Sequence, residues 1–408
     1  MTAPPRIDDA AAAAAAAIDW DKLGFDIVRT RSYAEYTWRD GAWDAGVLVP
    51  SGPLSLDVWA TSLHYGQACF EGLKAFRMRD GKVRVFRPDV NARRLQLSCR
   101  AISMPEVSVE LFVEAVNRAV TDNLDFVPPY GHSGSLYIRP FVVGSGPQVG
   151  LTPAPEFKFI VVVNPVGDYY RGGISQPVRA VIQHGFDRAA PRGTGHTKVA
   201  GNYAPCLGPT TRAKKHGYTV MLFLDPKTNR YIDEFATSNF AALTRPDVNG
   251  RRTYVTPRSR SILSSVTNRS LTELAVKHFG WTAERRQVSW DEVRSGAFDE
   301  VVACGTAVVV TPIGAIDREV LLDTAGASAD PRVAPLSSAT TGIEHLWDDA
   351  ELDNYTDDDD AAPRAVQSVE FSSNFEGFKQ LQKAYRQIQT GDLDGWESYG
   401  WMLPAAGL

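Results

Sequence analysis

Short runs of apolar residues, several of them alternating with polar ones, occupy the first 166 positions and end at glycine, proline or aspartate. Runs of this length with such ends are typical of β-strands. We expect strands at 30–38, 46–49, 83–86, 135–143 and 157–166. Apolar residues spaced three and four apart predict helices over 91–102 and 107–124. Together these elements predict a small α+β domain over residues 19–166.

A second block follows a stretch that is dense in glycine and closes with a proline. That stretch, residues 167–177, predicts an interdomain linker. Beyond it we expect strands at 178–184, 219–224, 230–234, 299–310 and 311–316, and helices at 203–216, 264–279 and 374–390. The block predicts a larger domain over residues 178–408, and the whole chain belongs to the mixed α+β or α/β class.

Two segments have a different composition. Residues 1–18 contain an alanine run behind Asp8 and Asp9, and we expect a disordered or loosely helical tail. A transit peptide would be rich in arginine and poor in acidic residues, which this tail is not. Residues 323–365 are rich in Ala, Ser, Thr and Asp, which predicts a flexible acidic insert. It is either a solvated excursion or a regulatory, partner-binding segment.

The overall composition excludes several classes of protein. The 408 residues carry a net charge of −5, so we expect no nucleic-acid or membrane-surface partner, because those would require a basic excess. No apolar stretch is long enough for a transmembrane helix. The four cysteines are widely spread and form no metal-ligand pair, so we expect no metal site and a reducing compartment, the cytoplasm.

The first candidate for chemistry is Lys198, which lies in a glycine-rich segment with Tyr203 five residues later and Glu234 thirty-six residues later. A pyridoxal phosphate (PLP) enzyme needs such a set. The lysine amine forms a Schiff base with the cofactor aldehyde, and a carboxylate on the pyridine nitrogen keeps the ring an electron sink. The phenol can hydrogen-bond the ring hydroxyl. Taken singly, each of these residues has an ordinary alternative: a surface lysine, a core tyrosine and a strand-end carboxylate.

Other residues are suited to binding anions. Arg94 near one helix start, and the free N–H groups of Val266 and Thr267 at another, are suited to a phosphate. The alternative is a surface ion pair and an ordinary N-cap. Tyr137 and Arg139 alternate along a strand and therefore point to one face, as an anion-binding pair or as a structural ion pair. Tyr65 is a candidate for the substrate carboxylate.

These motifs occur in the order found in one enzyme family. They are HYGQACFEGLKAFR at 64–77, LYIRP at 136–140, K-x-x-x-N-Y from Lys198, E-x-x-T-x-N from Glu234, and CGTA at 304–307. From about residue 25 to 402, apart from the acidic insert, the chain resembles the branched-chain amino acid aminotransferases of fold-type IV. The resemblance implies two domains, a barrel-like sheet in the larger one, and PLP at the domain interface.

The resemblance also implies a role for each residue. Lys198 would be the Schiff-base lysine, Glu234 the pyridinium partner and Tyr203 the ligand of the ring hydroxyl, and Thr237 would help to bind the cofactor. The remaining cofactor ligands would be those of the phosphate, namely Arg94, Val266, Thr267 and Thr306. The substrate α-carboxylate would be bound by Tyr65, Thr306 and Ala307. The substrate side chain would lie in an apolar pocket lined by Phe25, Phe70, Tyr137 and Tyr203. Arg139 would bind the side-chain carboxylate of glutamate, directly or by orienting Tyr137.

The reaction so implied is amino transfer from leucine, isoleucine or valine to 2-oxoglutarate, in a homodimer with each active site near the subunit interface. The alternatives are a D-amino acid or (R)-amine transaminase, an aminodeoxychorismate-type lyase, or a non-catalytic relative that binds PLP or a partner. The Tyr137–Arg139 strand favours the branched-chain subgroup.

The chain departs from the family at a few positions. Leu263-Ser264-Ser265 replaces Leu-Pro-Gly, which leaves backbone binding of the phosphate at this turn in question, and Ala236 replaces a glycine. Val308 and Thr311 occupy the positions of a redox Cys-x-x-Cys pair, so we expect no thiol switch.

Overall fold

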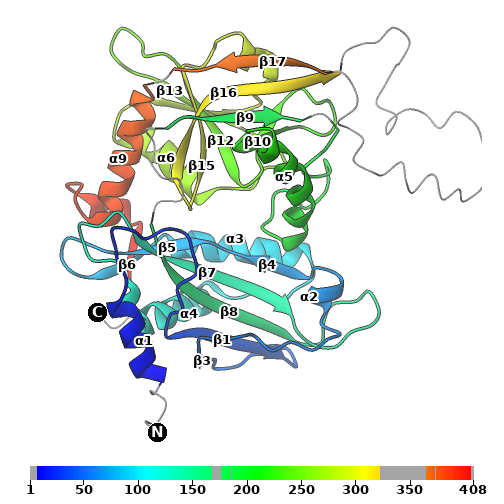
Figure 1. The fold of residues 1–408 in the computed structure, drawn as a ribbon, viewed down its shortest axis with the longest axis vertical. Helices are drawn as coiled ribbons and strands as arrows, with labels where there is room; N and C mark the ends of the chain where they lie inside the picture. Colours follow the sequence, from blue (N-terminus) through cyan, green and yellow to red (C-terminus); the bar gives the residue numbers. More distant parts are fainter. Residues whose placement is uncertain (1–6, 168–175, 184, 322–363, 373, 406–408) are drawn as a thin grey trace, which may run out of the picture.

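The computed structural model describes residues 7–167, 176–183, 185–321, 364–372 and 374–405, and two β-sheets dominate it (Figure 1). In the first sheet the strand order is β18-β6-β5-β7-β8-β1-β2, with β3 paired to β1 and β4 to β7. In the second the order is β11-β10-β9-β16-β15-β12-β13-β14, with β17 paired to β16. The two sheets correspond to the two sequence blocks except at the chain end.

The first sheet is built around two long antiparallel strands, β7 (Ser135–Gly144) and β8 (Phe157–Val166), which pair along their full length. Its other strands are β1 (Ser32–Arg39), β2 (Ala42–Trp43), β3 (Val47–Pro50), β4 (Ala68–Phe70), β5 (Leu73–Arg77), β6 (Val83–Phe86) and β18 (Met402–Pro404). A short helix, α2 (Thr61–His64), precedes β4, and helices α3 (Pro88–Ala101) and α4 (Val109–Asp122) pack on the sheet. The predicted strands of this block are present.

Local sequence explains where these helices begin. The Ser108 hydroxyl caps α4 by accepting a hydrogen bond from the Leu111 N–H at 3.0 Å. Helix α3 begins three residues before the predicted start because Pro88 occupies its first turn, where a missing N–H costs nothing. Arg87, in the left-handed region at φ +48°, turns the chain into that helix.

The second sheet closes on itself. An extra pairing of β11 with β12 completes a ring of six strands, namely β9, β10, β11, β12, β15 and β16. The strands of this sheet are β9 (Val178–Ile182), β10 (Val220–Leu224), β11 (Ile232–Phe235), β12 (Ser238–Leu243), β13 (Thr253–Pro257), β14 (Thr282–Arg286), β15 (Glu300–Gly305), β16 (Val309–Leu321) and β17 (Arg364–Glu370). The barrel-like sheet expected from the resemblance is therefore confirmed.

The helices of this half are α5 (Leu207–Lys215), α6 (Val266–Lys277), α7 (Trp290–Arg294) and α9 (Glu376–Thr390). The 3-10 turns of the described chain are Leu124–Phe126, Ala200–Asn202, Ala204–Cys206 and Trp396–Tyr399. The helix predicted over 203–216 thus begins with the 3-10 turn Ala204–Cys206, which carries Pro205 in its first turn, and is α-helical only from Leu207.

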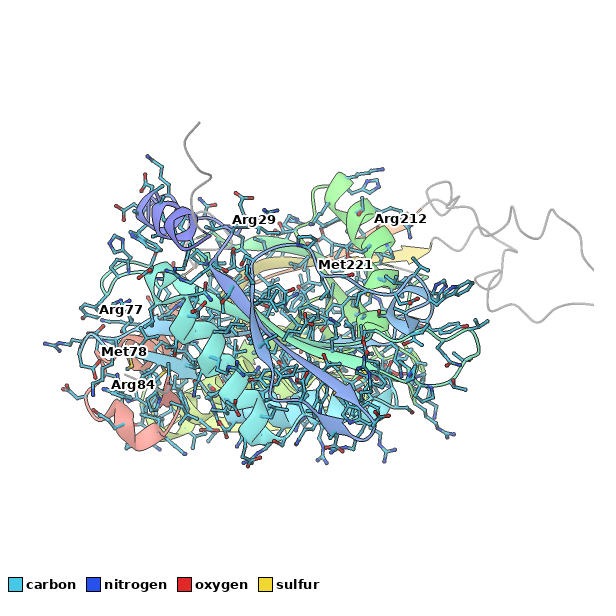
Figure 2. The ribbon with its side chains drawn as sticks, turned by 90° about the horizontal axis from the view of Figure 1, so that it is seen from below. Arg29, Arg77, Met78, Arg84, Arg212 and Met221 are labelled. Atoms are coloured by element: carbon cyan, nitrogen blue, oxygen red, sulfur yellow. The ribbon has the colours of Figure 1, made fainter. Side chains whose placement is uncertain are left out.

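The end of the chain returns to the first sheet, so residues 178–408 do not form one separate unit. Strand β18 pairs antiparallel with β6. The Arg84 guanidinium lies 5.1 Å from the ring centre of Trp396, and its Nη1 contacts the sulfur of Met78. Arg84 and Met78 are labelled near each other in Figure 2. Trp401 packs edge-on against Phe86. Trp401 and Met402 are buried in a core that also holds residues of β6, β12 and β15, so the end of the chain links the two halves.

Of the two alternatives expected for the N-terminal tail, disorder or a loose helix, the structure shows the helical one over residues 7–16, which form helix α1 (Ile7–Ala16). Alanine has the highest helix propensity, and Ala11 and Ala15 are buried against the first core. The greater part of the predicted linker 167–177 and nearly all of the predicted insert 323–365 lie outside the described residues.

Candidate active site

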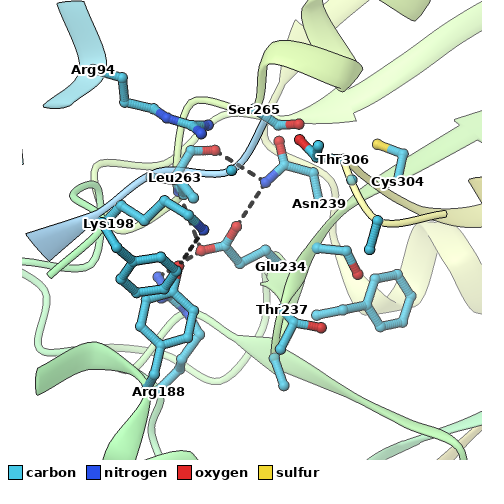
Figure 3. Close-up of a pocket in the computed structure, with 18 of the residues that line it drawn as sticks. Arg94, Arg188, Lys198, Glu234, Thr237, Asn239, Leu263, Ser265, Cys304 and Thr306 are labelled. Atoms are coloured by element: carbon cyan, nitrogen blue, oxygen red, sulfur yellow. Dashed lines mark hydrogen bonds and ion pairs between the residues drawn. The ribbon is translucent and has the colours of Figure 1, made fainter. Parts of the chain in front are cut away.

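A cavity of about 330 Å³ lies between the two sheets, and residues distant in sequence line it (Figure 3). Ten of the residues predicted for the site face it, namely Phe70, Arg94, Tyr137, Arg139, Lys198, Tyr203, Glu234, Thr237, Thr306 and Ala307. The first four come from the first sequence block and the other six from the second. The fold thus brings a cationic, an acidic and an aromatic group into one enclosure.

Lys198 is anchored through its backbone and directed by its side chain. Its N–H donates to the Ser98 hydroxyl at 2.9 Å, and its carbonyl accepts from the Phe70 N–H at 3.1 Å. Its Nζ donates to the Tyr203 hydroxyl oxygen at 3.0 Å. Burial, with the charge of Arg94 adding to it, lowers the pKa of Lys198 to about 7. A neutral, nucleophilic amine is therefore abundant at physiological pH.

Glu234, on β11, is held at both carboxylate oxygens. Oε1 accepts from the Leu263 N–H at 3.2 Å and pairs with the Arg188 guanidinium at 2.9 Å, and Oε2 accepts from the Asn239 amide at 2.7 Å. Burial raises the pKa of Glu234 to about 7, and Arg188 opposes that rise. The carboxyl group is thus fixed in orientation and poised to change charge with its surroundings.

A chain of side-chain hydrogen bonds supports the carboxylate from behind. The Asn239 oxygen accepts from the Asn268 amide at 3.0 Å, and the Asn268 oxygen accepts from the Tyr254 hydroxyl at 2.7 Å. The Asn268 amide also donates to Thr256 at 2.8 Å. The network links β11, β12, β13 and α6, and its satisfied buried groups keep Glu234 in place.

Arg94, from α3, is fixed by a fully buried acid. Its Nε and Nη2 donate to the two oxygens of Glu71 at 2.7 and 2.6 Å, while its Nη1 donates to the Ser264 carbonyl at 2.9 Å. Asn91 donates to the same carboxylate at 2.7 Å. A guanidinium has five N–H donors, so two remain for a ligand in the cavity.

The N-terminus of α6 lies beside Arg94. Ser265 caps this helix, and its hydroxyl accepts from the Asn268 N–H at 3.2 Å. Val266 and Thr267, the first two helical residues, are buried behind Ser265 rather than exposed along the cavity wall. Ser265 has an ordinary extended backbone (φ −77°, ψ 130°), so this turn does not require the glycine found in the family.

Tyr137 and Arg139 lie side by side, as their alternation on β7 predicted. Arg139 donates from Nη2 to the Tyr137 hydroxyl oxygen at 2.9 Å, and its guanidinium lies 4.8 Å from the ring centre of Phe70. Gly72 makes room for this pair, because a Cβ there would lie 2.4 Å from the Tyr137 hydroxyl. Phe25 approaches from outside, with its ring centre 6.1 Å from that of Tyr137, but it does not line the cavity.

Besides Phe25, Val266 and Thr267, Tyr65 is a predicted site residue that does not line the cavity of its own chain. It is 44% exposed, and its hydroxyl donates to the Val149 carbonyl in a separate surface hollow. Tyr65 follows the end of α2, and the nearest residue of the same motif that lines the cavity is Phe70, at the end of β4.

Sequence reasoning missed several residues of the cavity and its support, chiefly Arg188, Glu71, Asn239 and Gly72. Glu71 and Gly72 lay inside the quoted HYGQACFEGLKAFR motif, and Asn239 closed the E-x-x-T-x-N motif. Their presence there was a usable signal. Arg188 lies in no motif that was singled out, and only the folded chain places it on Glu234.

The predicted PLP fits the observed cavity. Arg94 has two spare donors, and the first N–H groups of α6 lie beside it, which suits a phosphate. The Lys74 ammonium donates to the Ala307 carbonyl at 2.9 Å and so holds the Gly305–Ala307 turn on the opposite wall. Lys198 and Glu234, the groups expected at the two ends of the pyridine ring, face the same space.

Comparison with known proteins gives consistent results. The model of the family "Amino-transferase class IV" matches residues 68–316. A branched-chain-amino-acid aminotransferase of Helicobacter pylori is 45% identical over 296 residues, which cover 72% of this chain and 85% of the relative.

Two solved structures of branched-chain amino acid aminotransferases share the fold. The Escherichia coli enzyme is 22% identical, with a TM-score of 0.63 over 91% of this chain and 99% of its own. The enzyme of Thermobaculum terrenum in its PLP form is 19% identical, with a TM-score of 0.62 over 91% of this chain and 98% of its own.

Proposed function

Because this chain belongs to the class IV aminotransferases, we propose that it is a PLP-dependent transaminase that moves the amino group of leucine, isoleucine or valine to 2-oxoglutarate. The family predicted from the sequence motifs is confirmed. The observation that carries the proposal is the joint presence, around one cavity, of Lys198, Glu234 and Arg94 with the Tyr137–Arg139 pair.

PLP supplies the electron sink that stabilises negative charge at the substrate α-carbon. Arg94, the N–H groups of Val266 and Thr267, and the Thr306 hydroxyl would hold its phosphate. Tyr203 would meet its ring hydroxyl, with Thr237 nearby, and Glu234 its ring nitrogen. The hydrogen bonds from Asn239 and Leu263 keep that carboxylate aimed at one point.

Lys198 acts as the base. With a pKa of about 7, its Nζ gives up and regains a proton near neutrality, which is the range in which a general base is most effective. The Tyr203 hydroxyl, 3.0 Å away, fixes the position of that nitrogen. A proton leaving the substrate α-carbon would be received at Lys198 Nζ.

Glu234 holds a proton on the ring nitrogen only while the carboxylate is ionised. Burial works against ionisation, and Arg188 works for it. A ring cation at the cavity side would favour ionisation further, because an opposite charge lowers a carboxyl pKa. Arg188 therefore contributes to the proposed function, because its charge helps to keep Glu234 ionised.

The substrate pocket must accept an aliphatic side chain in one half-reaction and an acidic one in the other. Phe70, Tyr137 and Tyr203 give it apolar walls, and the Phe70 and Tyr203 rings lie 4.9 Å apart. Arg139 brings a cation to the same walls, already partnered by the Tyr137 oxygen. One pocket can thus pack against the side chain of leucine and bind the side-chain carboxylate of glutamate. Thr306 and Ala307 would bind the α-carboxylate of either substrate.

The other fold-type IV chemistries are less well supported. The Tyr137–Arg139 pair and the relative at 45% identity both favour the branched-chain subgroup. A D-amino acid or (R)-amine transaminase, or an aminodeoxychorismate-type lyase, has no specific residue in its favour.

A homodimer is supported by an exposed apolar surface, the α2 surface, which we define as Val58, Trp59, Leu63, Tyr65, Val149 and Leu151. These side chains are 44–83% exposed. The surface is continuous, because the Gln148 N–H donates to the Trp59 carbonyl and Tyr65 to the Val149 carbonyl. Exposed apolar patches of this kind mark interaction sites. In a dimer formed there, Tyr65 would serve the cavity of the partner subunit.

The proposed location is the cytoplasm. All four cysteines are buried free thiols, as in proteins of reducing compartments. Among the residues described by the structure, no helix has the length and hydropathy that crossing a bilayer requires.

One set of assays tests the proposed function. PLP-loaded protein is given 2-oxoglutarate with L-leucine, L-isoleucine, L-valine, D-alanine or an (R)-amine, and glutamate formation is measured. We expect turnover with the three branched-chain L-amino acids and a loss of at least ~10³-fold in Lys198→Ala, which lacks the amine. Turnover of Lys198→Ala at the parent rate, or activity confined to the D-amino acid or the (R)-amine, contradicts the proposal.

A further inference from the structure

A second cavity lies behind the strand that carries Glu234. It measures about 600 Å³, and Asp233, on β11, lines it, whereas its neighbour Glu234 lines the first cavity. Successive side chains of a strand point to opposite faces, so β11 separates the two cavities. We call this second cavity the rear pocket. Its size is that of a small-molecule site.

Four cationic side chains surround the rear pocket, and none of them has an acidic partner among the described residues. They are Lys227, Arg258, Arg260 and Arg285. Across the described part of the chain, no ion pair or side-chain hydrogen bond is made by any of the four. By contrast Arg286, next to Arg285, is paired with both Glu284 and Glu292. Unpaired cations around a concave surface in an acidic protein indicate an anionic ligand.

The buried carboxylate of Asp233, at the floor of the rear pocket, calls for a hydrogen-bond donor. Asp233 is 3% exposed. The Ser259 and Ser261 hydroxyls of the same pocket donate hydrogen bonds to its carboxylate, but its Oδ1 has no hydrogen-bond partner among the described residues. The other acid of the pocket, Asp225, is already used, since it accepts hydrogen bonds from the Thr228 hydroxyl and from three backbone N–H groups of its own turn. A buried carboxylate oxygen left without a donor is costly, so a ligand that fills the pocket should supply one.

We propose that the rear pocket binds a small phosphorylated metabolite of nucleotide size, with its phosphate groups against Arg258, Arg260, Arg285 and Lys227 and a hydroxyl or amino donor on Asp233. Arginine presents paired N–H groups that match phosphate oxygens. A nucleoside diphosphate carries both features, with phosphates at one end and sugar hydroxyls and a base at the other. This site is separate from the transaminase cavity and does not depend on the proposed reaction.

Isothermal titration of the PLP-loaded enzyme tests the proposal, because bound PLP keeps the phosphate ligands of the first cavity occupied. The probes are ADP, inorganic pyrophosphate and adenosine. We expect ADP to bind more tightly than pyrophosphate, which lacks the donor for Asp233, and adenosine to bind weakest. The double variant Arg258→Ala/Arg285→Ala should weaken ADP and pyrophosphate binding by about tenfold or more.

The matched control is Arg245→Ala/Arg251→Ala, which removes two exposed arginines at the other end of β13 and should leave both affinities unchanged. An Asp233→Ala variant should lose the preference for ADP over pyrophosphate while it keeps pyrophosphate binding. The proposal is overturned if neither phosphorylated probe binds, or if the two double variants weaken binding equally, which indicates unspecific attraction. It is also overturned if Asp233→Ala leaves the preference for ADP unchanged.

Discussion

At the scale of single residues, Lys198 and Glu234 both titrate near neutrality although they are a base and an acid. Burial drives both shifts, downward for the pKa of the amine and upward for that of the carboxyl group. The two groups can therefore exchange charge with a bound molecule at physiological pH. Both pKa shifts result from burial in this cavity, since an exposed lysine or glutamate does not titrate near neutrality.

The shifted pKa of Lys198 predicts a measurable effect on stability. Because the folded-state pKa of about 7 lies below the unfolded value of 10.5, the unfolded chain holds the extra proton between these pH values. The folding penalty of Lys198 is thus complete below pH 7 and declines as the pH rises toward 10.5. In PLP-free protein, Lys198→Met should raise the melting temperature by at least ~2 °C at about pH 6.5.

The gain should shrink steadily between about pH 7 and 10, because there the wild-type protein recovers its lost stability. Melting temperatures of both proteins, measured by circular dichroism in parallel buffers, give the comparison, and groups that titrate in both proteins cancel. A gain that does not change with pH would mean that methionine acts only by packing.

Arg188 should determine the pH below which kcat declines, because it affects the pKa of Glu234. Its guanidinium, 2.9 Å from the carboxylate, favours the ionised form. Arg188→Gln removes that charge, so the pKa of Glu234 should rise, and the decline of kcat on acidification should begin about 1 pH unit higher or more. The measurement is kcat for L-leucine from about pH 5.5 to 9, across the range in which such a carboxyl group titrates.

Arg192→Gln is the matched control, because Arg192 is an exposed arginine of the same loop that does not contact Glu234. It should leave the profile in place. If Arg188→Gln lowered kcat equally at every pH, Arg188 would serve only to hold the loop, through its bonds to the Gly195 and Ser261 carbonyls.

The sequence predicted the residues that face the cavity better than those that support them. Lys198, Tyr203 and Glu234 lie in short motifs whose spacing is tied to their chemistry, so the motif alone identifies them. Glu71 and Arg188 act through contacts with residues 23 and 46 positions away, at Arg94 and Glu234. Pairings of this length depend on how the chain folds. The motif around Glu71 marks that residue without revealing its partner Arg94, and Arg188 lies in no motif.

At the scale of elements, the N-terminus of α6 joins stability to cofactor binding. The Ser265 hydroxyl caps the helix, and the neighbouring N–H groups would meet the phosphate. Ser265→Ala should lower the unfolding free energy by about 1 kcal/mol, whereas Ser265→Gly should cost only a few tenths. Ser265→Ala should also weaken PLP binding, because an uncapped helix start frays.

Ser108→Ala offers the matched control, since Ser108 caps α4 in the same way at a distance from the cavity. It should reduce stability by a similar amount and leave PLP affinity unchanged. Thermal unfolding and titration of PLP-free protein with PLP, followed by visible absorbance, measure both effects. Equal PLP affinities for Ser265→Ala and the parent would show that the N-terminus of α6 does not bind the phosphate.

Long periodic elements were predicted well, whereas some short or closely spaced strands were missed. The strands β7 and β8 and the helix α4 each repeat their pattern over ten or more residues. Strands β4, with three residues, and β12, which follows β11 after a two-residue turn, are too short or too close to a neighbour for a pattern to emerge. Their existence depends on pairing with β7 and β15, which is a tertiary effect.

At the scale of the whole molecule, the position of Tyr65 connects the active site to assembly. The motif predicts that Tyr65 binds substrate, yet its own chain directs it to the exposed α2 surface. The two facts agree if two subunits meet at that surface and each lends Tyr65 to the other. A closed twofold dimer makes such an exchange reciprocal.

Mixed dimers test this exchange directly. Lys198→Ala lacks the catalytic amine, and Tyr65→Ala lacks the proposed substrate ligand, so each variant alone should have little activity. In a mixed dimer, the subunit with Lys198 receives an intact Tyr65 from its partner, and one of the two cavities is complete. After the two variants are unfolded and refolded together, random pairing should restore roughly a quarter of the wild-type rate per subunit.

The control is the same procedure with Lys198→Ala and Glu234→Ala. Lys198 and Glu234 of one chain line the same cavity, together with Arg94 and Tyr203. Each cavity of such a mixed dimer therefore keeps one damaged residue that the partner cannot replace, and activity should stay low. Light scattering establishes the dimer, and failure of the Tyr65 pair to recover activity would place the action of Tyr65 within its own subunit.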